Sequence, residues 1–105
     1  MTDKIVVLST CESEHEAKRL AHILLEKRLA ACVNILPGAT SIFRWKDKVD
    51  EVQEYVVLIK SSRALFPALS KELQIAHSYE TPEIIALPIV EGSERYMSWL
   101  DAELT

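Results

Sequence analysis

The sequence has little cysteine and little glycine, and it has no long hydrophobic run. Cys11 and Cys32 are its only cysteines, and their spacing fits neither a zinc motif nor a disulfide framework, so we expect reduced thiols in a cytoplasmic protein. Two glycines, with no Gly/Ser tract and no internal repeat, exclude flexible linkers and solenoid architectures. The apolar run near the N-terminus is too short for a membrane span or a signal peptide, so neither is expected.

Charge and hydropathy narrow the range of partners. Twelve Lys and Arg against sixteen Asp and Glu give a net charge of −4. Such a chain lacks the cationic surface that phosphate backbones require, so no nucleic acid partner is expected. Hydrophobic residues make up 49% of the 105 residues, which is high for so short a chain. We therefore expect one domain, residues 1–105, that hides part of its apolar surface against a partner.

Hydrophobic periodicity predicts a β-α-β-β-α-β order followed by a final helix. The expected strands are 4–10, 30–36 continuing through 40–45, 54–60 and 83–89. The expected helices are 14–28, 65–77 and a short terminal helix capped by Ser93, with Tyr96, Trp99, Leu100 and Leu104 facing inward. This order is typical of the α+β, ferredoxin-like split βαβ fold, in which two helices pack on one face of an antiparallel sheet.

Local signals predict where several elements begin and end. Ser13 and Glu16 have the S-x-x-E form of a capping box at a helix start. Pro37-Gly38 predicts a turn that closes the second strand, and residues 45–48 predict the polar tip of a long β-hairpin. Residues 77–83 predict an aromatic and acidic turn after a helix, followed at once by a buried strand.

Several motifs, in order along essentially the whole chain, resemble the CutA divalent-cation-tolerance family. They are Arg28-Leu29-Ala30-Ala31-Cys32-Val33-Asn34-Ile35, then Ser41-Ile42-Phe43-Arg44-Trp45-Lys46 with Glu54 and Ile59-Lys60 after it, the H-x-Y-E-x-P-E-I-I turn of residues 77–85, and Tyr96-x-x-Trp99. The resemblance implies a ferredoxin-like protomer that assembles as a tight cytoplasmic homotrimer, with hairpins that cross between subunits. It also implies tolerance to copper and other divalent metals, and no established catalytic reaction.

Three positions depart from the family pattern. Phe43 stands where the family usually has Tyr, so a phenol donor is lost. Ser78 replaces the usual proline of H-P-Y-E, which we expect to loosen the turn and to leave a hydroxyl there. Some members carry a cysteine in the first strand, where this chain has Ser9, and Cys11 lies two residues later on the same face of a regular strand.

The candidate metal ligands are His77, Glu80 and Cys11. An imidazole beside carboxylates suits Cu(II) or another divalent cation, whereas a histidine at a helix C-terminus can also simply complement the helix dipole. Cys11 is expected to be exposed near a helix N-terminus, which would lower the pKa of its thiol, and Cys32 is expected to pack in the core. His15 and His22 are seven residues apart, which favours a solvated helix face over a metal clip.

A second candidate set resembles the residues around the inter-subunit cleft of CutA trimers. It comprises Trp45, Glu54, Lys60, Tyr79, Glu83 and Tyr96. Aromatic residues of this kind also dominate interfaces for packing reasons alone. Three functions follow: a copper-binding metal-response trimer, a PII-like trimer that senses a small molecule in the cleft, and a non-catalytic scaffold. No catalytic signature occurs, so no enzyme is expected.

Overall fold

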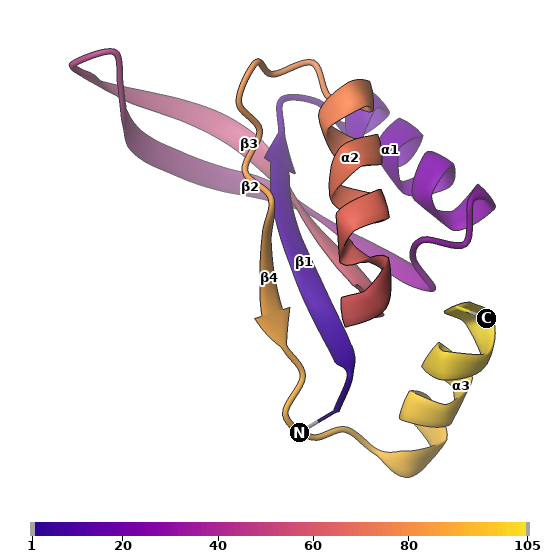
Figure 1. The fold of residues 1–105 in the computed structure, drawn as a ribbon. Coiled ribbons are helices and arrows are strands. Elements are labelled where there is room, and N and C mark those ends of the chain that lie inside the picture. Colours follow the sequence, from indigo (N-terminus) through magenta and orange to yellow (C-terminus); the bar gives the residue numbers. More distant parts are fainter. Residues whose placement is uncertain (1, 105) are drawn as a thin grey trace.

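A computed structural model describes residues 2–104, and it has the predicted α+β, ferredoxin-like architecture (Figure 1). The strands are β1 (Lys4–Cys11), β2 (Cys32–Trp45), β3 (Lys48–Ser62) and β4 (Ile85–Pro88). The helices are α1 (Glu14–Glu26), α2 (Phe66–Ala76), which follows a 3-10 turn at Arg63–Leu65, and α3 (Glu94–Leu104). The strands form one antiparallel sheet in the order β2-β3-β1-β4, so the predicted order of elements is confirmed.

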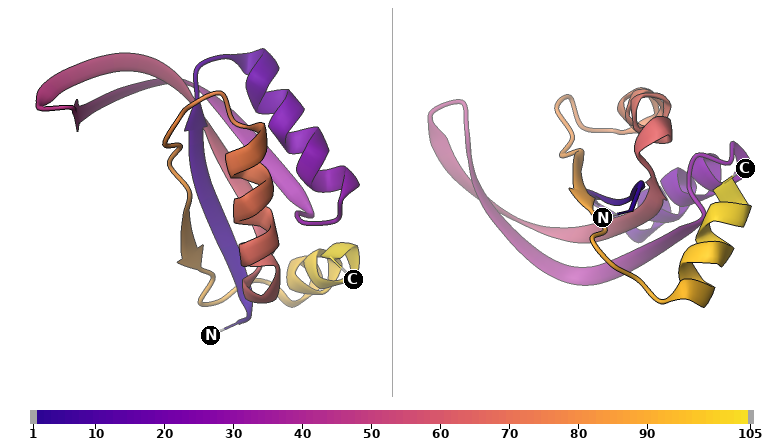
Figure 2. Two further views of the ribbon diagram at one scale, coloured as in Figure 1. Left: turned by 45° about the horizontal axis from the view of Figure 1, so that its top comes forward. Right: turned by 60° about the horizontal axis from the view of Figure 1, so that its bottom comes forward.

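The hydrophobic core lies between one face of the sheet and the helices α1 and α2, which both lie on that face (Figure 2). Side chains alternate across a strand, so Val7 of β1 and its cross-strand partner Ile59 of β3 point to the same face. Both are fully buried against Leu20 of α1 and Leu69 of α2. Burying each such side chain stabilises the fold by about 1.5–3 kcal/mol.

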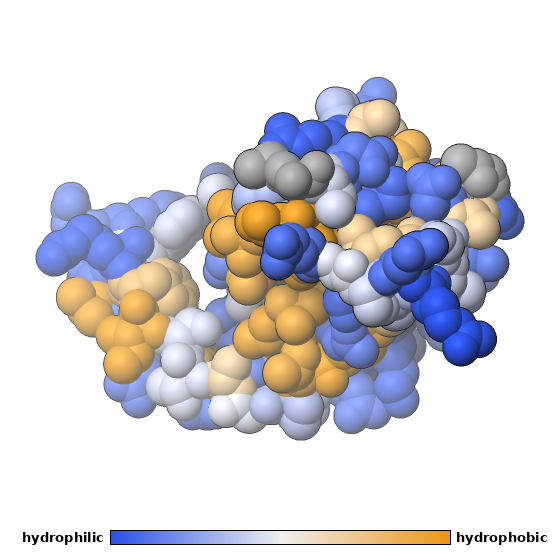
Figure 3. Space-filling view, turned by 90° about the horizontal axis from the view of Figure 1, so that it is seen from below, coloured by the Kyte–Doolittle hydropathy of each residue, from blue (hydrophilic) through white to orange (hydrophobic). Residues whose placement is uncertain are grey.

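The other face of the sheet is largely uncovered by α1 and α2, and beside Lys60, the cross-strand partner of Val6, it carries an apolar patch. We call it the open face; its side chains are Val6, Leu8, Leu58, Ile85 and Leu87. Ile85 and Leu87 of β4 are each 50% exposed. Seen from below, the molecule displays hydrophobic residues in its middle and again towards the end of the hairpin (Figure 3). The predicted fourth strand is present but shorter than 83–89, and its predicted burial is wrong: β4 is an edge strand whose four residues are all exposed.

The terminal helix α3 is only partly packed. Leu100 and Leu104 are buried as predicted, but Tyr96 and Trp99 remain 40% and 45% exposed, so the expectation that all four face inward is wrong. The buried Lys4 ammonium anchors the helix, because it lies 2.8 Å from Asp101. Among residues 2–104, no helix combines the length and the apolar character needed to cross a bilayer.

The β2–β3 hairpin extends as a curved arm beyond β1 and the helices (Figures 1 and 2). Its tip, predicted at residues 45–48, is confirmed: Lys46 and Asp47 have φ values of 49° and 67°, which is typical of a type I′ turn. The turn predicted at Pro37-Gly38 is wrong. These two residues face Tyr55 as a β-bulge within the continuous strand β2, and Gly38 takes a φ of 80°.

The C-terminus of α1 forms a Schellman motif around a non-glycine residue. The Leu29 amide donates to the Leu24 carbonyl at 2.9 Å, and the Arg28 amide donates to the Leu25 carbonyl at 3.1 Å. Arg28 therefore sits at the position that usually holds glycine, with a φ of 55°. A left-handed backbone costs an L-residue about 1–2 kcal/mol, so the motif is formed against a local strain.

We expect Arg28→Gly to raise the free energy of unfolding by about 0.5–1 kcal/mol, because glycine removes this strain. The matched control is Lys27→Gly one residue earlier, where φ is −86° and glycine brings no relief. Denaturant unfolding at one fixed protein concentration measures both variants. Equal destabilisation by the two substitutions would contradict the interpretation.

Candidate functional site

His77 is a buried residue that joins β1 to the turn after α2. Its Nε2 lies 2.8 Å from the Thr10 carbonyl oxygen, and the Tyr79 amide donates to its Nδ1 at 3.1 Å. A carbonyl only accepts, so Nε2 carries the proton and Nδ1 is the acceptor. Both ring nitrogens are thus occupied by the backbone, and in this geometry the ring has no lone pair left for a metal ion.

Glu16 holds the same turn from the other side. Its carboxylate accepts hydrogen bonds from the Ser78 amide at 2.7 Å and from the Ser78 hydroxyl at 2.9 Å. Only half of the predicted capping box is present: Ser13 Oγ accepts from the Glu16 amide at 3.1 Å, while the Glu16 side chain turns to Ser78. Proline has no N–H, so Ser78 supplies two donors that the usual residue cannot. The expected loosening of the turn is therefore wrong.

Tyr79 connects this turn to the hairpin. Its hydroxyl donates to the Glu54 carboxylate at 2.7 Å, and its ring lies 4.8 Å from the His77 ring. Glu54 is only 6% exposed. Burial, together with the hydrogen bond to this carboxylate, raises the pKa of Tyr79 well above its ordinary value. The phenol is therefore a fixed donor at neutral pH.

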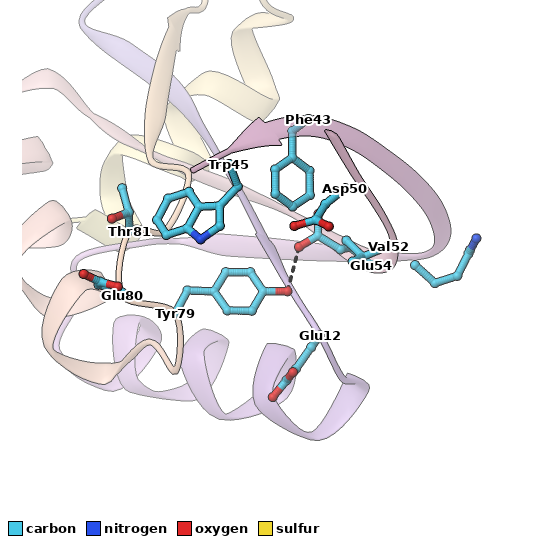
Figure 4. Close-up of a pocket in the computed structure, with 10 residues that line it drawn as sticks. Glu12, Phe43, Trp45, Asp50, Val52, Glu54, Tyr79, Glu80 and Thr81 are labelled. Atoms are coloured by element: carbon cyan, nitrogen blue, oxygen red, sulfur yellow. Dashed lines mark hydrogen bonds between the residues drawn. The ribbon is translucent and has the colours of Figure 1, made fainter. Parts of the chain in front are cut away.

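A pocket of about 450 Å³ opens between the hairpin and the turn that carries Tyr79 (Figure 4). Four acidic and three aromatic side chains line it, namely Glu12, Asp50, Glu54, Glu80, Phe43, Trp45 and Tyr79. The strand register explains the hairpin's part: Phe43 pairs with Asp50, so both lie on the face that also carries Glu54. No Lys, Arg or His of residues 2–104 lines the cavity. We call it the acidic pocket.

The predicted cleft residues divide into two groups in one chain. Trp45, Glu54 and Tyr79 meet in the acidic pocket, and Glu80 of the predicted metal set joins them. Lys60 lies six residues from Glu54 along β3, or about 20 Å, and its ammonium donates to Asn34.

The remaining members lie elsewhere, and two pocket residues were not anticipated. Tyr96 packs on Trp99 of α3 at 5.6 Å between ring centroids. Glu83 is exposed and does not line the pocket. The sequence interpretation missed Glu12 and Asp50; the hairpin register was the available signal for Asp50.

The predicted metal ligands do not come together in one chain. Cys11 is fully buried, and burial raises the pKa of its thiol, so the expected exposure and lowered pKa are both wrong. Cys32 is half-buried at the start of β2 and lies outside the core cluster, so its expected core position is also wrong. Within residues 2–104, no three His, Cys, Asp or Glu side chains are close enough to hold a metal ion.

The raised pKa of Tyr79 predicts an alkaline limit to stability. Above about pH 10 the unfolded phenol loses its proton while the folded one keeps it, so stability falls as pH rises. Tyr79→Phe should lower the free energy of unfolding at pH 7 by about 1.5–3 kcal/mol, because a charged acceptor loses its donor. The variant should also show a shallower decline above pH 10. Parallel stability curves for the two proteins would contradict this.

Comparison with known proteins gives one consistent result. Residues 5–103 match the family model described as CutA1 divalent ion tolerance protein. The divalent-cation tolerance protein CutA of Thermus thermophilus is 50% identical over 90% of this chain and 92% of its own length. That of Pectobacterium atrosepticum is 43% identical over 99% of this chain and 94% of its own length. The crystal structure of CutA from Xylella fastidiosa superposes with a TM-score of 0.95 at 36% identity, covering 99% of this chain and all of that one.

Proposed function

The chain belongs to the CutA1 divalent ion tolerance protein family, and from that membership we propose that it is a non-enzymatic, cytoplasmic homotrimer that binds Cu(II) or another divalent cation. The observation that carries the proposal is the acidic pocket, whose lining includes four carboxylates and no basic side chain of the described residues. No three of these carboxylates are close enough together to hold an ion within residues 2–104, so the proposed site needs a further ligand from a neighbouring subunit. A reducing compartment also suits the two free thiols.

The charge of the pocket is uncompensated. None of its four carboxylates belongs to an ion pair within residues 2–104. Glu54 is the most buried of them, and Tyr79 is its single hydrogen-bond donor among residues 2–104. A buried carboxylate without a nearby cation is costly, and a divalent cation would relieve that cost. Carboxylate oxygens are suitable ligands for hard cations and for Cu(II) in tetragonal sites.

In this proposal the predicted metal ligands change roles. Glu80 remains a candidate ligand because it lines the pocket. His77 becomes a positioning residue, since its Nδ1 accepts from the Tyr79 amide and so fixes the ring that holds Glu54. Cys11 becomes a packing residue, since its side chain is fully buried.

The proposed trimer is supported by edge strands and exposed apolar side chains that one chain leaves unpaired and uncovered. β2 and β4 are edge strands, and such edges invite pairing with another chain. The open face adds exposed Ile85 and Leu87, and the outer side of the hairpin adds exposed Ile42 and Val49.

Light scattering at micromolar concentration should give about three times the 11.9 kDa chain mass. Leu87→Lys should shift that mass towards the monomer, because it places a charge in a buried interface. Ile75→Lys is the matched control: Ile75 of α2 is 70% exposed but lies away from the open face, so the mass should stay unchanged. A monomeric wild-type protein would refute the assembly.

Calorimetric titration of Cu(II) into the tag-free chain should show saturable binding. Glu80→Gln should weaken it by about tenfold through the loss of one charged ligand. The control Glu51→Gln removes the same charge from the outer side of the hairpin, where Glu51 pairs with Ile42, and it should leave the affinity for Cu(II) unchanged. Binding that survives Glu80→Gln and Glu54→Gln but disappears in His77→Ala would contradict the acidic pocket as the site.

One observation favours the small-molecule alternative. A volume of about 450 Å³ lies within the range of ligand sites for small molecules and far exceeds the space of a single metal ion. The absence of basic side chains among the described lining residues argues against an anionic ligand.

A further inference from the structure

We propose that the acidic pocket binds a small organic cation of the alkylammonium class, held by its aromatic side chains as well as by its carboxylates. This inference goes beyond divalent metal binding, because a metal ion would use only the carboxylate oxygens, whereas an organic cation would also contact the aromatic rings. It concerns a second class of ligand and does not depend on whether the pocket also takes a metal.

The aromatic side chains of the pocket are placed as walls rather than as core. Phe43 and Trp45 stand on the same face of the hairpin and are 41% and 39% exposed, while Tyr79 faces them from the turn after α2 (Figure 4). Exposed apolar rings beside a cavity are costly in water and are covered when an alkyl chain packs on them. Aromatic faces also attract cations through the negative potential of the ring.

The Trp45 ring already has an ammonium group near its face in the free chain. Lys46, its neighbour at the hairpin tip, places Nζ 5.7 Å from the ring centroid. This distance is within the range of a cation–π contact. Lys46 does not line the pocket, so this contact leaves the cavity open.

The carboxylates supply a full negative charge to attract an ammonium group, which the aromatic rings do not carry. Tyr79 donates to one oxygen of Glu54, and the other oxygen has no hydrogen-bond donor among residues 2–104. Only 6% of the Glu54 surface is exposed to solvent. An ammonium group donates up to three hydrogen bonds and accepts none, which matches a lining rich in acceptors and poor in cations.

The size of the cavity selects an organic cation over a bare ion. The volume of about 450 Å³ far exceeds the space of a single ion and lies within the range of sites for small molecules. An alkylammonium would fit in this space with its methylene groups against Phe43, Trp45 and Val52 and its charge at Glu54 or Asp50.

The test is a calorimetric titration of the chelator-treated 105-residue chain with n-pentylammonium chloride, with 1-pentanol as the neutral isostere. We expect saturable binding of the ammonium and none of the alcohol. Glu54→Gln should weaken binding about tenfold, because its charge is lost while the amide oxygen still accepts from Tyr79. Trp45→Leu should weaken it about 2- to 30-fold.

Two further variants make the test independent of folding defects and of general charge. Asp50→Asn changes an exposed pocket residue on the hairpin arm and should also weaken binding. Glu51→Gln changes the adjacent, outward-facing carboxylate and should not. Equal binding of 1-pentanol, equal losses in Glu51→Gln and Asp50→Asn, or no binding of the ammonium would each overturn the inference. Because metal is removed, these results stand apart from the Cu(II) titration, whose failure would overturn only the proposed metal function.

Discussion

The hydrogen bond from the Tyr79 hydroxyl to the buried Glu54 carboxylate is the contact on which the candidate site depends. It joins the turn after α2 to a hairpin that otherwise leaves the body of the protein. Behind it, His77 accepts from the Tyr79 amide and donates to the Thr10 carbonyl of β1. A continuous chain of hydrogen bonds therefore runs from the central sheet to the pocket wall. The residues that make these hydrogen bonds position the pocket wall. The other carboxylates and the aromatic rings that line the pocket remain available to a ligand.

A second constraint is the length of the hairpin relative to the core. α1 and α2 cover one face of the sheet and none of the hairpin's outer half, so Ile42 and Val49 stay exposed. The open face is likewise poorly covered at β4, where Ile85 and Leu87 are half exposed. One chain cannot bury these residues, and identical copies offer the same edges in return. The fold and the proposed trimer are thus consequences of the same sequence pattern.

Much of the fold was predictable because its signals are local. Strand and helix periodicity and the hairpin tip at residues 45–48 were correct. The wrong predictions concern features that depend on contacts with residues distant in the sequence. Pro37-Gly38 looks like a turn in sequence, but the register of β3 makes it a bulge. Cys11 was expected just beyond the first strand, but it is the last residue of β1 and is buried in the core between the sheet and the helices. Glu54, Tyr79 and Glu80 were anticipated by resemblance, whereas pairing across the hairpin brings in Asp50.

We infer that one chain alone leaves apolar surfaces and strand edges exposed and that copies of the same chain cover them. Residue-resolved hydrogen exchange of β2 tests this most directly. As an edge strand, β2 has amides that point away from β3 and have no partner among residues 2–104. We expect these amides to exchange slowly in the native protein, because a neighbouring subunit pairs with or buries them. Exchange as rapid as that of an unstructured peptide along the whole outer edge would contradict it.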